Sequence, residues 1–281
     1  MKMIRVLLLT ILILAMVICV EGQTGISSDT VVVHSGKLQL RALLWRPQGK
    51  GPFPAILFNH GRGLKPQTEG RVEGINALGR VFASHGYVFM GLFRRGEGLS
   101  ADQGVFIGNL LELERAAKGD EAAKRLQLRL LESDHLTDAL AGLAFLRKLS
   151  EVDRRRVAVA GHSFGGSLAM LVAERDRSVR AVANFAGAAG IWEDSGELRE
   201  RLVAAVDQIT APVLFVYTEN DFSSAPGKVL AAEMTRRSKV NSLKLFPPFG
   251  RTAAEGHGFV YLGIANWEQD VFSFLDKHVK R

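Results

Sequence analysis

Cysteine is nearly absent from this sequence: its 281 residues include one, Cys19. A single thiol excludes a scaffold held together by disulfides and a zinc site built from several cysteines. Internal repeats, low-complexity segments and long Pro/Ser-rich linkers are missing too. Apolar residues make up 47% of the chain, which is too many for a disordered protein and ordinary for a globular one.

The formal net charge is +7, but the basic residues are interspersed with acidic ones. No basic stripe is interleaved with aromatic residues, so we expect a solvated basic surface and no nucleic-acid partner. Metal-ligand clusters are not evident in the sequence. The short Gly96-Glu97-Gly98 lacks the further glycine and the context of a dinucleotide site. We therefore expect neither a metal nor a cofactor.

The N-terminus has the layout of a secretory signal. Lys2 and Arg5 precede the apolar run Val6–Val20, and small residues allow cleavage after Gly22. We expect residues 23–281 to form one domain in a secreted or periplasmic protein. The apolar run is shorter than the ~20 residues of a membrane span. A retained membrane anchor is one alternative, and membrane contact is then expected only through this segment. A lipoprotein modified at Cys19 is the other, disfavoured because Ile18 is not small.

Short apolar runs alternate with helix-like stretches along the rest of the chain. Runs with little polar alternation are typical of strands covered on both faces, and strand–helix alternation predicts a mostly parallel sheet flanked by helices. We expect eight strands at Val31–Val33, Leu38–Trp45, Ala55–Asn59, Gly86–Leu92, Val157–Gly161, Val179–Phe185, Val213–Thr218 and Leu243–Phe246. Helices are expected at Val72–Ser84, Asp134–Leu149, Ser167–Arg175, Gly227–Arg237 and Trp267–His278.

The stretch 101–133 is long for a loop and is helix-like from Glu121 to Leu131. An insertion at the carboxyl edge of a sheet can form a lid over a pocket. A surface decoration without function is the alternative, and the sequence does not separate the two.

A candidate nucleophile lies in Gly161-His-Ser-Phe-Gly165, which fits the pattern G-x-S-x-G. The pattern follows an expected strand and precedes an expected helix. A sharp strand-to-helix turn holds the serine in a strained conformation with its hydroxyl exposed, and only glycine fits two residues before and after it. Ser163 is therefore the expected nucleophile.

These residues resemble the α/β-hydrolase fold, and more narrowly the dienelactone hydrolase-like family, which is related to the prolyl oligopeptidase-type enzymes. The approach Arg155 to Gly166, the stretch Pro52 to Gly63 and the loop Arg95 to Ser100 carry the resemblance. It extends from about residue 31 to the end. The family's namesake has a cysteine nucleophile where this chain has Ser163, which puts lactone specificity in doubt.

A serine nucleophile needs an imidazole base and a carboxylate that orients it, and in this fold the chain order is Ser, acid, His. Asp221 follows an expected strand and is the preferred acid, with Glu219 as the competitor. His257, between two glycines, is the expected base. The remaining histidines have weaker patterns: His60 and His162 are expected to brace or pack, His278 to be solvated, and His34, His85 and His135 have no partner pattern.

Two backbone N–H groups should stabilise the oxyanion. The residue after the nucleophile, Phe164, supplies one. The resemblance implies Arg62 for the other, with Gly61 as the alternative. The Arg62 side chain could also meet an acidic substrate, although a solvated arginine is the simpler interpretation.

The sequence thus predicts an exported serine hydrolase of the carboxylic ester class (EC 3.1.1). It would cleave an ester or lactone of a small-molecule acyl substrate through an acyl-enzyme. A serine peptidase or an acyltransferase on the same fold is the alternative. A non-catalytic binding protein is less consistent, because no triad member is missing. Neither the substrate nor the oligomeric state follows from the sequence.

Overall fold

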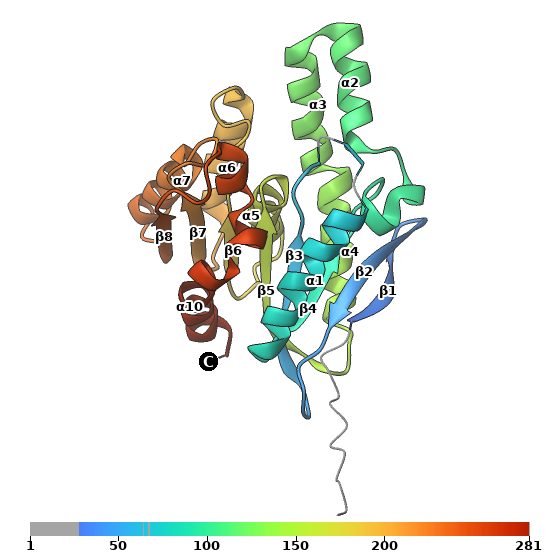
Figure 1. Ribbon diagram of the computed structural model, residues 1–281, viewed down its shortest axis with the longest axis vertical. Helices are drawn as coiled ribbons and strands as arrows, with labels where there is room; N and C mark the ends of the chain where they lie inside the picture. Colours follow the sequence, from blue (N-terminus) through green and yellow to red (C-terminus); the bar gives the residue numbers. More distant parts are fainter. Residues whose placement is uncertain (1–27, 64, 67, 281) are drawn as a thin grey trace, which may run out of the picture.

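One eight-stranded sheet forms the centre of the computed structural model, which describes residues 28–63, 65–66 and 68–280 (Figure 1). The strand order is β1-β2-β4-β3-β5-β6-β7-β8. β1 and β2 are antiparallel to their neighbours, and the strands from β4 to β8 are parallel. The strands are β1 (Ser28–Ser35), β2 (Leu38–Trp45), β3 (Phe53–Asn59), β4 (Val88–Leu92), β5 (Val152–His162), β6 (Val182–Phe185), β7 (Val213–Thr218) and β8 (Asn241–Phe246).

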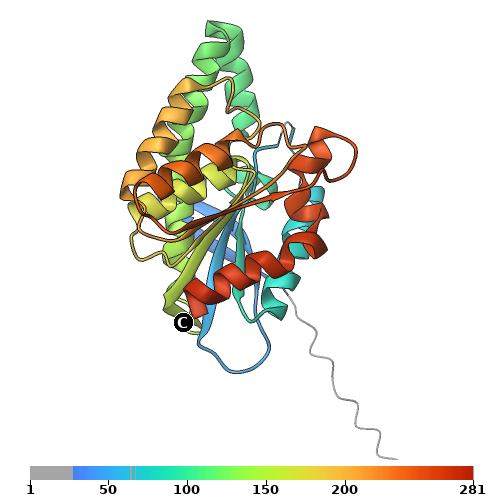
Figure 2. The ribbon, with the colours of Figure 1, turned by 90° about the vertical axis from the view of Figure 1, so that its left-hand side faces the viewer.

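Helices cover both faces of this sheet (Figures 1 and 2). Successive side chains of a strand point to opposite faces, and in β3 Leu57 joins one apolar cluster while Ile56 and Phe58 join the other. Burial on both faces explains why the strands lack polar alternation. The first cluster packs against α4 (Asp134–Leu146), α5 (Phe164–Arg175), α6 (Gly196–Gln208) and α7 (Ala225–Arg236); the second packs against α1 (Glu69–Ser84), α9 (Phe259–Leu262) and α10 (Ile264–Leu275).

The expected fold class is confirmed, and the eight expected strands are present, β2 and β7 with the expected bounds and the other six with shifted ends. Four α-helices were not expected. α6 lies in the stretch after β6, and the insertion is a hairpin of two helices, α2 (Ile107–Lys118) and α3 (Asp120–Glu132), rather than one. The short α8 (Ala253–His257) and α9 lie where a loop was expected. The expected export segment 1–22, with Cys19, lies outside the described residues. Within the described part, none of the helices is long and apolar enough to span a bilayer.

The parallel strands give the sheet two chemically different edges. β3, β5, β6, β7 and β8 all end at the carboxyl edge, where ligands bind in open α/β sheets. The α2–α3 hairpin follows β4 at this edge and projects beyond the body of the molecule (Figure 2). The opposite, amino edge carries the loops that precede these strands.

Candidate active site

Ser163 lies at the turn between β5 and α5, with φ 55° and ψ −119°. A positive φ is uncommon for a residue with a side chain and costs free energy, so the surrounding packing must hold the turn. The two glycines of the motif make that packing tight. A Cβ on Gly161 would lie 2.0 Å from the Gly165 carbonyl oxygen, and a Cβ on Gly165 would lie 2.0 Å from the Asn59 carbonyl oxygen.

The structure brings His257 and Asp221 together. His257 Nδ1 lies 2.8 Å from Asp221 Oδ1. The Asp221 side chain is 1% exposed, and its Oδ1 also accepts a hydrogen bond from the Phe222 backbone N–H at 2.7 Å. Glu219, the competing acid in the sequence, is exposed. This contact makes Nδ1 the protonated nitrogen and leaves Nε2 available as an acceptor.

His257 is the last residue of a short helix, α8 (Ala253–His257), and not part of a plain loop. Thr252 and Glu255 form a capping box that starts this helix. Gly256 permits close packing: a Cβ there would lie 2.6 Å from Asn220 Oδ1. The glycine next to the histidine therefore serves packing against the acid loop.

Asn220 joins the acid loop to the segment that carries His257. Its side-chain amide donates to the carbonyl oxygens of Phe249 and Thr252 at 2.9 and 3.1 Å and accepts from the Phe249 N–H at 2.8 Å. Sequence reasoning missed this role, because an asparagine in a turn is ordinary. The bonds fix the acid and the histidine relative to each other.

His162, beside the serine, supports His257 from the other side. Its Nε2–H donates to the His257 carbonyl oxygen at 2.8 Å, and its ring packs against His257 and Tyr261 at centroid distances of 4.7 and 5.2 Å. Burial, with a smaller contribution from the charge of His257, holds the pKa of His162 well below its usual range. A neutral His162 fits a packing role.

The loop after β3 is held by two arginines. Arg71, on α1, donates from Nη1 to the Gly61 carbonyl oxygen at 2.6 Å, and Arg94 Nη1 donates to the His60 carbonyl oxygen at 2.7 Å. Glu97 balances both cations, with Arg71 Nη2 at 3.1 Å and Arg94 Nη2 at 3.9 Å. Burial lowers the pKa of Arg94 to about 10 and raises the pKa of Glu97.

The contacts of this loop determine the directions of the backbone N–H groups of Gly61 and Arg62. The Gly61 backbone N–H faces the Tyr261 oxygen. Burial raises the pKa of Tyr261 to about 12, against the charges of Arg71 and Arg94 and a smaller effect of the Gly61 N–H. The peptide between Gly61 and Arg62 is trans, so the Arg62 N–H points opposite to the Gly61 carbonyl that Arg71 holds. Gly61 also lies against the nucleophile, since a Cβ on it would be 3.3 Å from Ser163 Cβ.

Ser163, Phe164, His257 and Arg62 all line one cavity of about 730 Å³. Apolar side chains from several elements form most of its wall, and the α2–α3 hairpin supplies one side; the apolar lining residues include Leu111, Leu128, Leu131, Ile191, Leu198 and Phe222. Phe222, 55% exposed, lies beside the His257 ring at a centroid distance of 4.9 Å. The cavity therefore suits an acyl group with an apolar portion.

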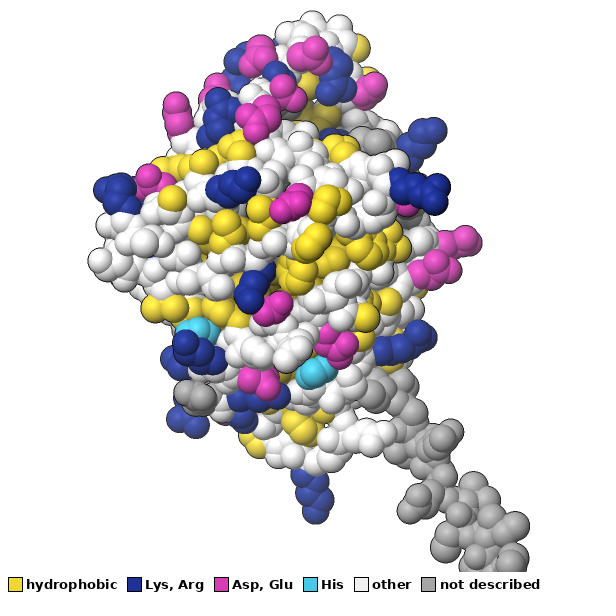
Figure 3. Space-filling model, turned by 60° about the vertical axis from the view of Figure 1, so that its left-hand side comes forward, with side chains coloured by type: hydrophobic (Ala, Val, Ile, Leu, Met, Phe, Trp, Pro, Cys, Tyr) yellow, Lys and Arg dark blue, Asp and Glu magenta, His cyan; other side chains and the backbone are white. Residues whose placement is uncertain are grey.

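The charged residues in the wall of this cavity are Arg62, Arg115, Asp120, Lys124 and Asp194. Burial lowers the pKa of Arg62. Interspersed cations and acids cover the tip of the hairpin, where Arg115 pairs with Glu112 and Asp120, and hydrophobic side chains gather across the middle of the same face (Figure 3). Among the residues that the structure describes, no group of three or more His, Cys, Asp or Glu could hold a metal ion.

Comparisons with known proteins agree with this geometry at the level of the fold. The model of a family described as the dienelactone hydrolase family matches residues 40–261. No curated protein sequence matches the chain. A dienelactone hydrolase from Klebsiella pneumoniae, described as putative, is a structural neighbour with a TM-score of 0.65 and 17% identity, covering 92% of this chain and 99% of its own.

Two further neighbours have other descriptions. An acylaminoacyl peptidase from Pyrococcus horikoshii has a TM-score of 0.65 and 18% identity over 91% of this chain, and this chain spans only 42% of that protein. Est1E from Butyrivibrio proteoclasticus, solved with ferulic acid bound, has a TM-score of 0.63 and 20% identity, covering 89% of this chain and 100% of its own. At these identities the likeness concerns the fold.

Proposed function

We propose, from the premise that this chain belongs to the dienelactone hydrolase family, that it is a serine hydrolase cleaving carboxylic esters or lactones of small molecules. The observation that carries the proposal is the contact of 2.8 Å between His257 and Asp221. His257 borders the same cavity as Ser163, which sits at a strained strand-to-helix turn.

Each residue has a defined step in the proposed reaction. Ser163 Oγ attacks the acyl carbon while His257 Nε2 takes the hydroxyl proton, and Asp221 stabilises the imidazolium through Nδ1. The alcohol leaves with the proton from His257, which forms the acyl-enzyme. A water then attacks the ester of Ser163 and gives its proton to His257, which passes it to Ser163 Oγ as the acid leaves and the free serine is restored.

The oxyanion is assigned to the backbone N–H groups of Phe164 and Arg62. Phe164 is the first residue of α5, and the negative charge develops at the positive end of this helix. Arg62 is preferred over Gly61, because the Gly61 N–H faces the Tyr261 oxygen and the Arg62 N–H points opposite to the Gly61 carbonyl that Arg71 holds. Each such donor is typically worth 10²–10³ in rate.

The test is hydrolysis of nitrophenyl esters of graded acyl length by the wild type and Ser163→Ala. We expect the variant to lose turnover and labelling by a fluorophosphonate, and the exposed Ser273→Ala to keep both. Ester turnover that survives Ser163→Ala would remove the assignment. A panel of peptides and alcohol acceptors run in parallel distinguishes a peptidase or an acyltransferase from an esterase.

We also propose that the protein is exported. The support is the sequence of residues 1–22, with two cations before an apolar run. The N-terminal sequence of the protein recovered from its host tests this, and we expect it to begin at Gln23. Recovery of an intact Met1 in the cytoplasmic fraction would contradict export.

A further inference from the structure

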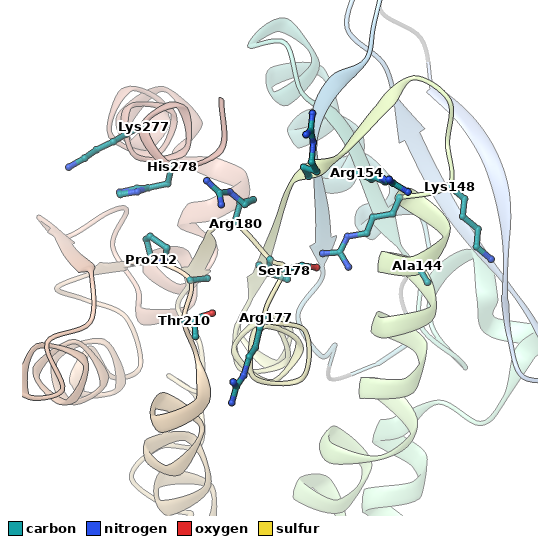
Figure 4. A pocket seen from close by; sticks show the side chains of 14 residues that line it. Ala144, Lys148, Arg154, Arg177, Ser178, Arg180, Thr210, Pro212, Lys277 and His278 are labelled. Atoms are coloured by element: carbon teal, nitrogen blue, oxygen red, sulfur yellow. The ribbon is translucent and has the colours of Figure 1, made fainter. Parts of the chain in front are cut away.

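A second hollow, of about 950 Å³, lies at the amino edge of the sheet, opposite the catalytic cavity. Its walls come from the end of α4, the start of β5, the α5–β6 and α6–β7 loops and the C-terminal residues (Figure 4). Its floor is apolar and includes the buried Val179 and Ala211. We call this hollow the basic groove, because its lining includes Arg147, Lys148, Arg154, Arg155, Arg177, Arg180, Lys277 and His278 and no acidic residue.

Part of this charge is structural. Arg147 pairs with Asp176, Arg155 lies 3.8 Å from Asp153, and Arg177 donates to Gln208 at 2.8 Å. A cation at the C-terminal end of a helix also offsets the helix dipole, which accounts for Arg147 after α4. These contacts leave other cations of the groove unexplained.

Four lining cations have no such partner. Within residues 28–280, apart from 64 and 67, Lys148, Arg154, Arg180 and Lys277 form no ion pair with a carboxylate. All four are exposed, and they come from four separate segments (Figure 4). Like charges gathered around one hollow repel one another, and an anion bound among them removes that cost.

The groove lies at the edge of the sheet where the N-terminal part of the chain enters the fold, and this position indicates which anion the groove binds. Ser28 pairs with Trp45, which pairs with Phe89 at the start of β4, so the chain enters the fold at the amino edge. The apolar run ends at Val20, and residues 21–27 reach at most about 25 Å when fully extended. In the form of the chain that keeps this run as an anchor, the alternative to cleavage after Gly22, this edge therefore faces the lipid surface.

We propose that the basic groove binds phosphate headgroups of an anionic phospholipid surface, with the catalytic cavity turned away from it. Basic pockets on a membrane-facing side are suited to phosphate headgroups, and the attraction amounts to about 1 kcal/mol for each nearby Lys or Arg. The groove has no aromatic platform of Phe, Tyr or Trp for stacking bases, which disfavours a nucleic acid.

The test compares sedimentation of the full chain with vesicles of phosphatidylcholine alone and of phosphatidylcholine mixed with phosphatidylglycerol. The apolar N-terminal segment contributes to binding of both kinds of vesicle. The difference in binding between the two kinds therefore measures the charge-dependent part of the affinity. We expect Arg154→Gln combined with Arg180→Gln to weaken that part about thirtyfold, or about fivefold per cation, and added salt to weaken it in the wild type.

The matched control is Arg125→Gln combined with Arg129→Gln. These arginines are exposed on α3 at the opposite edge, and the pair removes the same charge. An equal loss in both double variants, or no preference for the anionic vesicles, would overturn the proposal. Unchanged Tm values show that the variants fold. If the double variant Arg154→Gln and Arg180→Gln does not fold, the double variant Lys148→Gln and Lys277→Gln takes its place.

Two probes separate the sources of the anion. Inorganic pyrophosphate should raise the wild-type Tm and compete with the anionic vesicles, because it carries the same phosphate chemistry. Pyrophosphate binding without vesicle binding would show that the groove binds a soluble phosphate compound, and it would overturn the proposal of a lipid surface. Tighter binding of duplex DNA than of vesicles, lost in the groove variant, would overturn it in favour of a nucleic acid.

Discussion

At the scale of single residues, the choice between two neighbouring acids rests on burial. Asp221 is buried and holds His257, whereas Glu219 is exposed. Asp221→Asn should lower kcat about 10⁴-fold, because an amide favours the wrong imidazole tautomer. Glu219→Gln should leave ester turnover unchanged. Steady-state kinetics on one nitrophenyl ester measures both, and similar losses in the two variants would contradict the assignment.

Sequence reasoning could find the three proposed catalytic residues because each carries a local signal. Ser163 has glycines at fixed offsets, Asp221 follows an apolar run, and His257 lies between glycines. Arg71, Asn220 and Tyr261 have no such signal. Their roles arise from contacts between segments far apart in the chain, such as Asn220 with Thr252, and spacing along the sequence does not encode these.

At the scale of elements, α1 acts on the site through Arg71. Arg71→Gln removes the bond to the Gly61 carbonyl and leaves Glu97 with one cation fewer. We expect kcat to fall about tenfold to a hundredfold with little change in KM, less than the loss of an oxyanion donor itself. Arg71 is thus a positioning residue, and its effect should appear in the transition state.

The control for Arg71 lies on the same helix. Arg80 is exposed and stacks over the Trp45 ring at 5.5 Å, away from the loop after β3. Arg80→Gln should keep kcat, while Arg71→Lys should restore part of what Arg71→Gln loses. A rise in KM at constant kcat in Arg71→Gln would show that the residue serves substrate binding instead.

The α2–α3 hairpin is expected to set the acyl length. Leu128 lines the catalytic cavity from α3, whereas Leu113 on α2 is 68% exposed and outside it. Leu128→Trp should lower kcat/KM for octanoate esters at least about tenfold relative to acetate esters, since a filled pocket excludes methylenes. Leu113→Trp should keep the wild-type profile. An unchanged profile in Leu128→Trp would indicate that the hairpin does not contact the acyl chain.

The elements differ in how well the sequence predicts them. The sequence predicts strands such as Val213–Thr218 well, because a short apolar run bounded by loop residues is too short for most helices and forms a buried strand. Helix α6 was missed because charged residues fill much of its first half, around Leu198. Its N-cap, Ser195, which accepts from the Leu198 N–H at 3.3 Å, was the available signal.

At the scale of the whole molecule, three buried histidines tie stability to pH. Burial holds the pKa values of His60, His135 and His162 well below their usual range. The unfolded chain binds protons on these groups below about pH 6.5, and the folded chain does not. Stability is therefore complete above that pH and is lost as the pH falls, by up to about 1.4 kcal/mol per pH unit for each histidine.

His135 offers the cleanest variant for this pH effect. It is buried edge-on against the Phe164 ring at 5.3 Å, and Nδ1 has no hydrogen-bond partner among the described residues. In His135→Leu, the free energy of unfolding should depend less steeply on pH between 5 and 6.5, by about one proton. Urea unfolding at several pH values measures the slope. An unchanged slope would show that His135 does not contribute.

The two edges of the parallel sheet give the molecule a fixed orientation. Residues after the strands form the catalytic cavity, and residues before them form the basic groove. Adsorption on a sulfonated resin through the groove would therefore leave the substrate entrance facing the bulk liquid. The fold thus provides oriented immobilisation without an added tag, and attachment through the hairpin would block the same entrance.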